Sequence, residues 1–271
     1  MTRIGDFTQP DTNADYFVEF LEQLDEHPPV RAMRADTLQR LEIGPDCKVI
    51  DVGCGIGGAT FRMASRAGPT GHVVGVDISS ALIDVSRRRS AARAAQRLAA
   101  AEAALEFQVA DAAALPYPDG FFDVSYCERV LLYVPDRLAV LHELRRVVTP
   151  GGRVCIVDVD FDATAIYSTR REFTRKLTSI VAAAIPNPNS ARDLPVLARE
   201  SGLKELRVET LAVTTPHPFM VHAMGGVLAQ AAARGVIDKA ELEEWLEEQR
   251  LLNERRDFFH AWLTVRITGL A

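Results

Sequence analysis

The sequence lacks the features that mark disulfide-stapled, zinc-binding and polyanion-binding proteins. Its four cysteines, Cys47, Cys54, Cys127 and Cys155, lie far apart and form no C-x-x-C pair. This spacing predicts reduced, mostly buried thiols rather than a disulfide framework or a metal site. The formal net charge is −6, so there is no electrostatic case for binding nucleic acid or an acidic membrane surface.

Long apolar runs, internal repeats and low-complexity linkers are also missing. No apolar stretch approaches the ~18–20 residues that span a bilayer, and residues 1–16 are too polar and acidic for a secretory signal. The composition, 48% hydrophobic and 25% charged, is that of an ordinary globular protein. We therefore expect a cytoplasmic protein, a monomer or a homodimer, whose partner is a small-molecule substrate and neither nucleic acid nor a membrane.

Residues 1–44 are expected to form an N-terminal helical cap. Apolar residues recur at helical spacing between Phe17 and Leu24, and Pro28-Pro29 then ends this helix and opens the next. A second apolar stripe runs from Val30 to Leu41. Because this segment is too helical for a floppy tail, we expect it to pack on the rest of the chain, over the mouth of a ligand site.

Residues 45–160 alternate between strands and helices. We expect strands near residues 48–52, 72–77, 105–110, 121–126 and 153–158, with helices after the first, second and fourth of them, the second reaching to about Ala103. Such alternation predicts an α/β fold with a parallel, doubly wound sheet. Residues 161–271 read as the C-terminal part of the same domain. There we expect substrate-pocket helices at about 168–184, 190–201, 219–234 and from Asp238, and two last strands at 203–214 and 259–270.

The stretch Val49-Ile-Asp-Val-Gly-Cys-Gly-Ile-Gly-Gly58 predicts a buried strand, a turn that lets backbone touch a ligand, and a helix N-terminus. Its glycines spell G-x-G-x-x-G, which with Asp77 downstream fits a dinucleotide-binding turn. They also spell D-x-G-x-G-x-G starting at Asp51, and an acid before the turn suits an ammonium better than a pyrophosphate. S-adenosylmethionine has an adenosine ribose at one end and an ammonium at the other, which fits both acids.

An ordered set of motifs between Lys48 and Asp158 resembles class I S-adenosylmethionine-dependent methyltransferases, in the branch of the ubiquinone and menaquinone methylases. The motifs are VIDVGCGIGG, VVGVD, FQVADAAALPYPDGFFDVSY, RVLLYVPD and LRRVVTPGGRVCIVD. The resemblance implies a seven-stranded Rossmann-like sheet, mostly parallel, with the helical cap and insertions described above. It implies S-adenosylmethionine as cofactor and methylation of a small, largely apolar metabolite in secondary metabolism, at oxygen in preference to carbon or nitrogen.

The resemblance also implies which residues hold the cofactor, namely Asp51, Gly53, Gly55, Gly57, Asp77, Ile78, Asp111, Ala112 and Cys127. Asp51 would lie at the methionine end. Asp77 would accept both ribose hydroxyls, since a carboxylate is an acceptor only. Asp111 and the Ala112 N–H would serve the adenine, although a turn cap is the structural alternative for Asp111. Cys127 would face the methionine together with Glu128.

Transfer to oxygen requires a base, and we expect Glu128, His217 or His222 to supply it. Surface exposure or ordinary packing is the alternative for each histidine. Arg31 and Arg34 could reach a carboxylate of cofactor or substrate. The run Asp158-x-Asp160-x-Asp162 could bind a cation, but no Asn partner follows at the expected spacing, so we expect no metal. Two other functions stay open: a cyclisation or rearrangement that uses the same cofactor without methyl transfer, and an NAD-dependent dehydrogenase.

Overall fold

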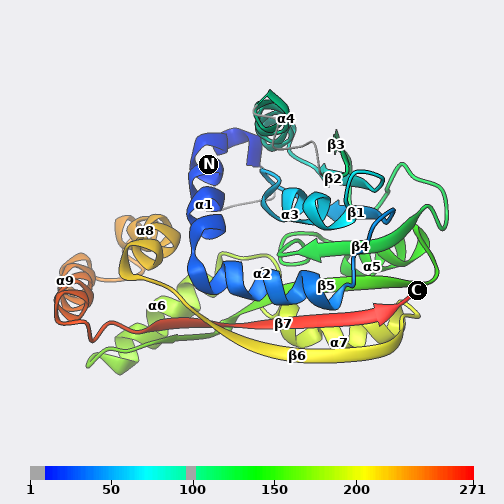
Figure 1. The fold of residues 1–271 in the computed structure, drawn as a ribbon. Coiled ribbons are helices and arrows are strands. Elements are labelled where there is room, and N and C mark those ends of the chain that lie inside the picture. The colour runs from blue at the N-terminus through cyan, green and yellow to red at the C-terminus, as the bar shows by residue number, and fades with distance from the viewer. Residues whose placement is uncertain (1–9, 96–101) are drawn as a thin grey trace.

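A computed structural model describes residues 10–95 and 102–271, and Figure 1 shows their fold. The strands of this part of the chain form one seven-stranded sheet in the order β3-β2-β1-β4-β5-β7-β6. Their bounds are β1 Lys48–Val52, β2 His72–Asp77, β3 Ala104–Val109, β4 Phe122–Glu128, β5 Val148–Ile166, β6 Lys204–Thr214 and β7 His260–Leu270. β7 runs antiparallel to both β5 and β6, and the other pairings are parallel.

Helices cover both faces of the sheet. Their bounds are η1 Pro10–Asn13, α1 Ala14–Glu26, α2 Pro28–Arg40, α3 Gly58–Ala67, α4 Ser80–Ala95, α5 Arg137–Arg146, α6 Arg171–Ala183, α7 Ser190–Glu200, α8 His217–Ala233 and α9 Lys239–Arg255. One apolar cluster joins α2 and α3 to one face, and a second joins α5 and α7 to the other. The seven-stranded, mostly parallel α/β fold predicted from the sequence is confirmed.

The strand β1 lies at the centre because its sequence is apolar on both sides. Val49, Ile50 and Val52 are completely buried, so this strand reads as a continuous hydrophobic run rather than an alternating one. β1 pairs with β2 on one side and β4 on the other. The chain order reverses at this point, and ligands of open α/β sheets bind at the carboxyl ends of the strands there.

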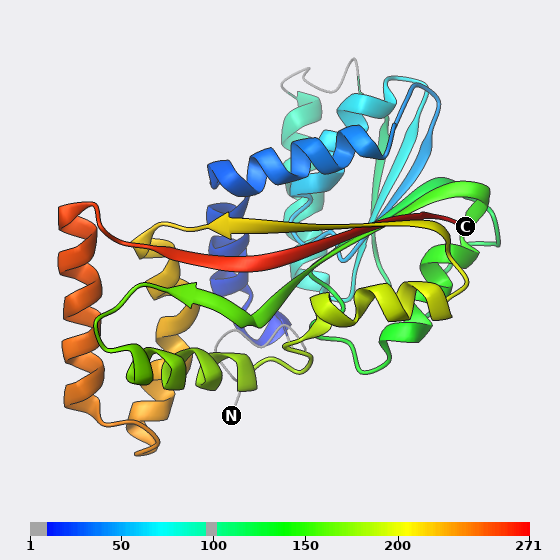
Figure 2. The same ribbon diagram turned by 90° about the horizontal axis from the view of Figure 1, so that it is seen from below.

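A helical lobe extends from the far ends of β5, β6 and β7, as Figure 2 shows. Helices α6, α8 and α9 meet there around an apolar cluster of their own, which includes Phe173, Met220 and the completely buried Trp245. The Trp245 indole N–H donates to Thr174 Oγ1 at 2.9 Å, which ties α9 to α6.

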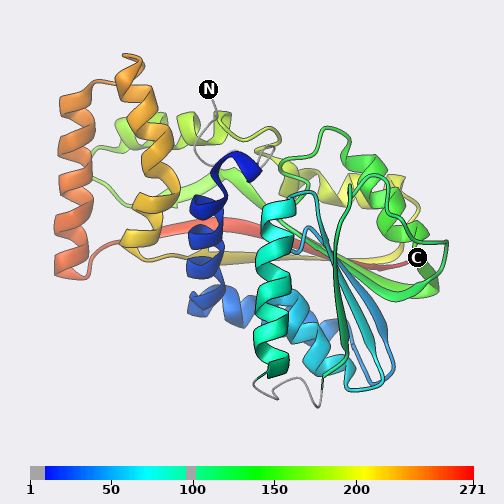
Figure 3. The same cartoon turned by 90° about the horizontal axis from the view of Figure 1, so that it is seen from above.

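The N-terminal helices pack against the rest of the chain, and Figure 3 shows α1 between α4 and α8. Pro28 and Pro29 open α2 as predicted. The Asp11 carboxylate of η1 accepts hydrogen bonds from the Ser79 hydroxyl, from the Ser80 hydroxyl at 3.1 Å and from the Ala81 N–H at 3.2 Å. It therefore caps the N-terminus of α4 from outside that helix.

Several boundaries differ from the expectation. β5 spans Val148–Ile166 rather than 153–158, because its outer half pairs with β7 as far as Ile166 opposite His260. Helix α8 begins at His217, directly after Pro216. The expected extension of α4 over residues 96–101 lies outside the described residues. Within the described ranges, no helix is both long and apolar enough to cross a membrane.

Candidate functional site

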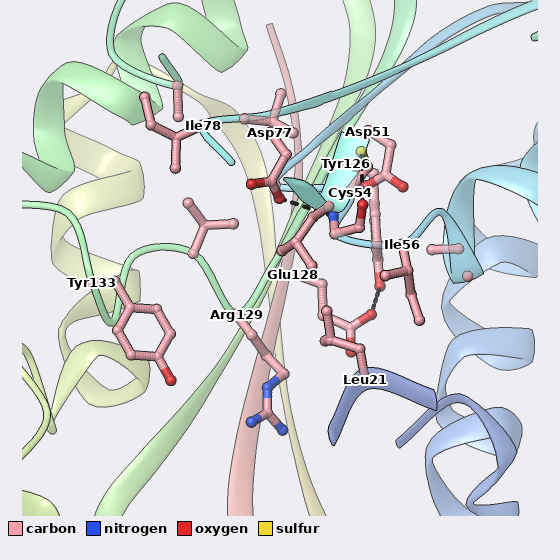
Figure 4. Close-up of a pocket in the computed structure, with 18 of the residues that line it drawn as sticks. Leu21, Asp51, Cys54, Ile56, Asp77, Ile78, Tyr126, Glu128, Arg129 and Tyr133 are labelled. Atoms are coloured by element: carbon pink, nitrogen blue, oxygen red, sulfur yellow. Dashed lines mark hydrogen bonds between the residues drawn. The ribbon is translucent and has the colours of Figure 1, made fainter. Parts of the chain in front are cut away.

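A cavity of about 540 Å³ lies at the carboxyl ends of β1, β2 and β4, where the strand order reverses (Figure 4). Its floor is the glycine turn after β1, and acids that end neighbouring strands surround it. Phe20, Leu21 and Leu24 of α1 and Arg34 of α2 close it from the cap side. The N-terminal helices therefore form part of the wall of the cavity.

The glycine turn is held close to β2 by its backbone. The N–H groups of Gly53 and Cys54 donate to the Val76 carbonyl at 2.8 and 2.9 Å. Gly53 has φ +76°, and a Cβ there would lie 2.1 Å from Val130 Cγ2. Gly57 caps helix α3 with φ +85° and does not line the cavity. Glycine is thus required at Gly53 both by the backbone conformation and by the neighbouring chain.

Asp51 lies under the turn and is 2% exposed. Its Oδ2 accepts a hydrogen bond from Thr60 Oγ1 at 2.6 Å. Burial raises the pKa of the Asp51 carboxyl to about 7, although the Thr60 hydroxyl opposes the rise. A cation in the cavity would favour the ionised form of this carboxyl.

Asp77 ends β2, and both of its oxygens face the cavity side of the turn. Oδ2 accepts from the Gly55 N–H and Oδ1 from the Ser79 N–H, each at 2.9 Å. Burial raises the pKa of Asp77 above its usual value, although these backbone donors oppose the rise. Each carboxylate oxygen can accept more than one hydrogen bond, so capacity for a ligand remains. The next side chain, Ile78, is 58% exposed and also lines the cavity.

Asp111 and Ala112 follow β3 and line the same cavity. Asp111 is exposed, and its Oδ1 accepts from the Ala113 N–H at 2.9 Å. One oxygen of Asp111 therefore caps the turn, as the structural alternative had it, and the residue also lines the cavity.

Glu128 belongs to a buried network at the end of β4. Its Oε2 accepts from Arg34 Nε at 2.7 Å and from the Tyr126 hydroxyl at 2.6 Å. Its Oε1 is buried and has no partner among the described residues. Burial alone would raise the pKa of Glu128, but the Arg34 guanidinium and the Tyr126 hydroxyl hold it below its usual value. Arg34 also pairs with Asp25, whose carboxylate lies over Gly58 at the N-terminus of α3.

Four predicted site residues lie outside the cavity wall, namely Gly57, Cys127, His217 and His222. Cys127 is completely buried in β4, and burial raises the pKa of its thiol well above the usual value. His222 stacks on Tyr16 with ring centroids 4.9 Å apart. His217 meets Phe258 edge-on at 5.3 Å, and burial and Arg250 lower its pKa. Arg31, the second cap arginine, is exposed and away from the cavity.

Sequence reasoning missed Arg129, Tyr133 and Asn187, which all line the cavity. Asn187 Nδ2 donates to the carbonyls of Leu131 and Val134 at 2.9 and 2.8 Å, so it fixes the loop after β4. An arginine directly after an acid at a strand end was the available signal for Arg129. No signal pointed to Asn187, because its partners lie more than fifty residues away.

Asp158 and Asp160, in the middle of β5, are occupied by protein groups. Asp158 accepts from Ser190 Oγ at 2.6 Å, and Asp160 accepts from Arg192 Nη2 at 2.8 Å. Among the residues that the structure describes, no group of three or more His, Cys, Asp or Glu side chains could hold a metal ion.

Comparison with known proteins places this site in a family. The chain belongs to the methyltransferase-domain family, whose model matches residues 43–250. An uncharacterized 37.1 kDa protein of transposon TN4556 from Streptomyces fradiae is 32% identical over 189 residues, which are 68% of this chain and 51% of that protein. Demethylmenaquinone methyltransferase of Lactococcus lactis is 33% identical over 134 residues, which are 49% of this chain and 50% of that enzyme. The match therefore spans about half the length of these curated relatives.

A solved structure extends the likeness to the whole chain. The [4+2]-cyclase SpnF has a TM-score of 0.59 at 18% identity, and the match covers 98% of this chain and 97% of that one. At this identity the likeness shows the fold alone. Family membership confirms the predicted class, a class I S-adenosylmethionine-dependent methyltransferase, and S-adenosylmethionine as its cofactor. It sets aside the NAD-dependent dehydrogenase.

Proposed function

We propose that this chain transfers a methyl group from S-adenosylmethionine to an oxygen of a small, largely apolar acceptor of the kind made in secondary metabolism. The observation that carries the proposal is a single cavity in which the glycine turn and strand-end acids meet an apolar wall. The apolar part of that wall comes from α1 and the loop after β4, and comprises Phe20, Leu21, Leu24, Val130, Tyr133 and Val134.

The acids of the cavity fit a cationic amino-acid nucleoside. Asp51 and the unpartnered Oε1 of Glu128 would hold the ammonium at the methionine end. Asp77 would accept from the ribose hydroxyls with the lone pairs that Gly55 and Ser79 leave free. Ile78, Asp111 and Ala112 would surround the adenine. When bound, S-adenosylmethionine supplies an electrophilic methyl group on a sulfonium.

The remaining work of the protein is alignment and exclusion of water. Helices α1 and α2 cover the cavity, and the buried pair of Arg34 and Glu128 holds α2 against β4. We assign Glu128 to holding positive charge rather than to removing a proton, because its lowered pKa keeps it ionised and makes it a weak base. Neither the His217 ring nor the His222 ring lines the cavity. The base role expected for them stays a prediction.

Two measurements test the proposal. Calorimetry should show binding of S-adenosylmethionine and none of NAD. Label from methyl-labelled S-adenosylmethionine should then appear in at least one member of a panel of phenols and hydroxylated polyketide-like acceptors. Tight cofactor binding with no transfer to any acceptor would reject the methylation and favour a cyclisation or rearrangement on the same cofactor.

A further inference from the structure

Arg129 occupies a strained position at the edge of the cavity. It directly follows β4, lines the cavity and has φ +61°, a left-handed conformation that is unfavourable for a non-glycine residue. Its N–H donates to the Val157 carbonyl at 2.8 Å, which holds the strained conformation against β5. Figure 4 shows the side chain reaching away from Asp77, towards the part of the cavity that Leu21 and Tyr133 line.

The Arg129 guanidinium lies against two aromatic rings. It lies 5.7 Å from the Phe20 ring centroid and 5.4 Å from that of Trp262. Phe20 and Trp262 are 7% and 6% exposed, so this contact removes water from the guanidinium. Within residues 10–95 and 102–271, no hydrogen bond or ion pair involves the guanidinium of Arg129.

The two arginines of the cavity differ in this respect. Arg34 is already neutralised by Asp25 and Glu128. Burial acts to raise the pKa of both Glu128 and Asp158, and the charge of Arg129 is among the influences that oppose this rise, so both carboxylates feel it. Neither carboxylate forms an ion pair with it: Glu128 Oε2 accepts from Arg34 and Tyr126, and Asp158 accepts from Ser190. Arg129 thus keeps its five N–H donors and its positive charge without a carboxylate partner, at a cavity whose other arginine is already paired with acids.

We propose that Arg129 binds an anionic oxygen group of the acceptor, a carboxylate or a phosphate, and so orients an otherwise apolar molecule in the cavity. This role of Arg129 rests on the proposed function, because the anionic molecule is taken to be the methyl acceptor. A guanidinium already packed against two rings needs little further ordering to make a bidentate contact with such a group. The acids at the other end of the cavity repel an anion, so a charged head group selects one orientation.

The alternative is a purely structural role, in which Arg129 only joins Phe20 of α1 to Trp262 of β7. The two roles differ in one measurable respect. Loss of a structural contact weakens the binding of charged and neutral molecules alike. Loss of an anion contact weakens only the charged ones, so the ratio of affinities for an acid and its amide separates the roles.

The test uses calorimetry on the full chain saturated with S-adenosylhomocysteine. The probes are 4-hydroxybenzoate, 4-hydroxyphenylacetate and 3-(4-hydroxyphenyl)propanoate, each beside its own amide, with phenyl phosphate beside phenol to distinguish phosphate from carboxylate. In the wild type, at least one anion should bind at least tenfold more tightly than its neutral partner. Arg129→Gln should bring that ratio close to one, and Arg129→Lys should retain part of it.

Arg175→Gln, which removes an exposed charge on α6, should leave the ratio unchanged. The proposal is overturned if no anion binds better than its neutral partner, or if Arg129→Gln keeps the preference. The readout needs no turnover, so it is separate from the fate of the proposed function. An Arg129-dependent anion preference without label transfer would keep the anion site and reject methylation.

Discussion

Arg34 of α2 donates from Nε to Glu128 Oε2 at 2.7 Å, and the two side chains are 8% and 6% exposed. The same guanidinium pairs with Asp25 at the end of α1. One buried cation thereby joins both N-terminal helices to the carboxyl end of β4. The N-terminal helices and the wall of the cofactor cavity are consequently joined by buried ion pairs.

Replacing Arg34 by Met should destabilise the fold strongly. The change leaves the Glu128 and Asp25 carboxylates without their cation, and breaking a buried ion pair from one side costs about 3–5 kcal/mol. Urea unfolding at neutral pH measures the loss. Arg40→Met on the same helix is the matched control, because its pairs with Asp36 and Glu209 are partly exposed and should contribute little to stability. Equal losses in the two variants would contradict the assignment.

Much of the fold could be predicted because local signals agree with the global arrangement. The buried run in β1 gave the central strand, and Pro28-Pro29 gave the break between α1 and α2. A helix was expected to begin at Asp238, and the Asp238 side chain accepts from the Glu241 N–H at 2.9 Å. Such signals are short in range, so they survive without tertiary information.

The remainder depends on contacts between distant parts of the chain. The full length of β5 comes from its pairing with β7, which begins some hundred residues later. The cavity positions of Asp51, Asp77 and Asp111 agree with the expectation, because each acid follows or ends a predicted strand. His217 and His222 were predicted as site residues only because related folds carry substrate residues in this segment. The predicted start of the helix was also two residues later than the start of α8. Arg129 was missed because neither its positive φ nor its aromatic neighbours can be read from adjacent residues.

Cofactor affinity should rise with pH up to about 7. The raised pKa of Asp51, about 7, means that this carboxyl is largely protonated below that value in the free protein. A cation that needs the ionised form therefore binds less well as the pH falls, by up to about tenfold per pH unit. Calorimetry between about pH 5.5 and 7 measures the slope, below the range in which an α-amino group titrates. Asp51→Asn should flatten the dependence of cofactor affinity on pH, whereas Asp158→Asn should leave this dependence unchanged.

The same raised pKa predicts the opposite trend for the stability of the free protein. The folded state holds a proton on Asp51 that the unfolded state has already released, so this contribution is full below about pH 4 and is lost as the pH rises through about 7. Asp158, with a pKa also raised to about 7 by burial, adds to this trend. A free energy of unfolding that increases over this interval in wild type but not in Asp51→Asn would contradict the reading.

Asp77→Asn should weaken S-adenosylmethionine binding by about 1.5–3 kcal/mol through loss of charged hydrogen bonds. Asn is a better test than Ala, because the carboxylate also accepts from the N–H groups of Gly55 and Ser79, and Ala would remove both acceptors. Calorimetry gives the affinity, and thermal unfolding reports whether the turn survives. An unchanged dissociation constant in a folded variant would refute the ribose role.

Gly53→Ala should abolish cofactor binding and destabilise the chain. The new Cβ would lie 2.1 Å from Val130 Cγ2, and φ +76° is unfavourable for alanine by roughly 1–2 kcal/mol. Gly225→Ala in α8 is the control, because its Cβ would meet nothing within 4 Å and alanine favours the helix by about 0.5–1 kcal/mol. Calorimetry and urea unfolding on both variants should therefore give changes of opposite sign in stability, with the cofactor affinity of Gly225→Ala intact.

His222→Phe should stabilise the protein by about 1 kcal/mol and leave cofactor affinity unchanged. The ring stacks on Tyr16 at 4.9 Å, and its buried Nε2 has no partner among the described residues, which is a desolvation cost that phenylalanine avoids. His222→Ala should instead lose the stacking on Tyr16 and unfold more easily. Urea unfolding of the two variants therefore separates the effect of ring packing from the effect of the polar nitrogen. Loss of methyl transfer in His222→Phe, with stability and cofactor affinity kept, would show that this imidazole acts on the acceptor after all. In that case α8 must approach the cavity during turnover, because its ring does not line the cavity in the structure.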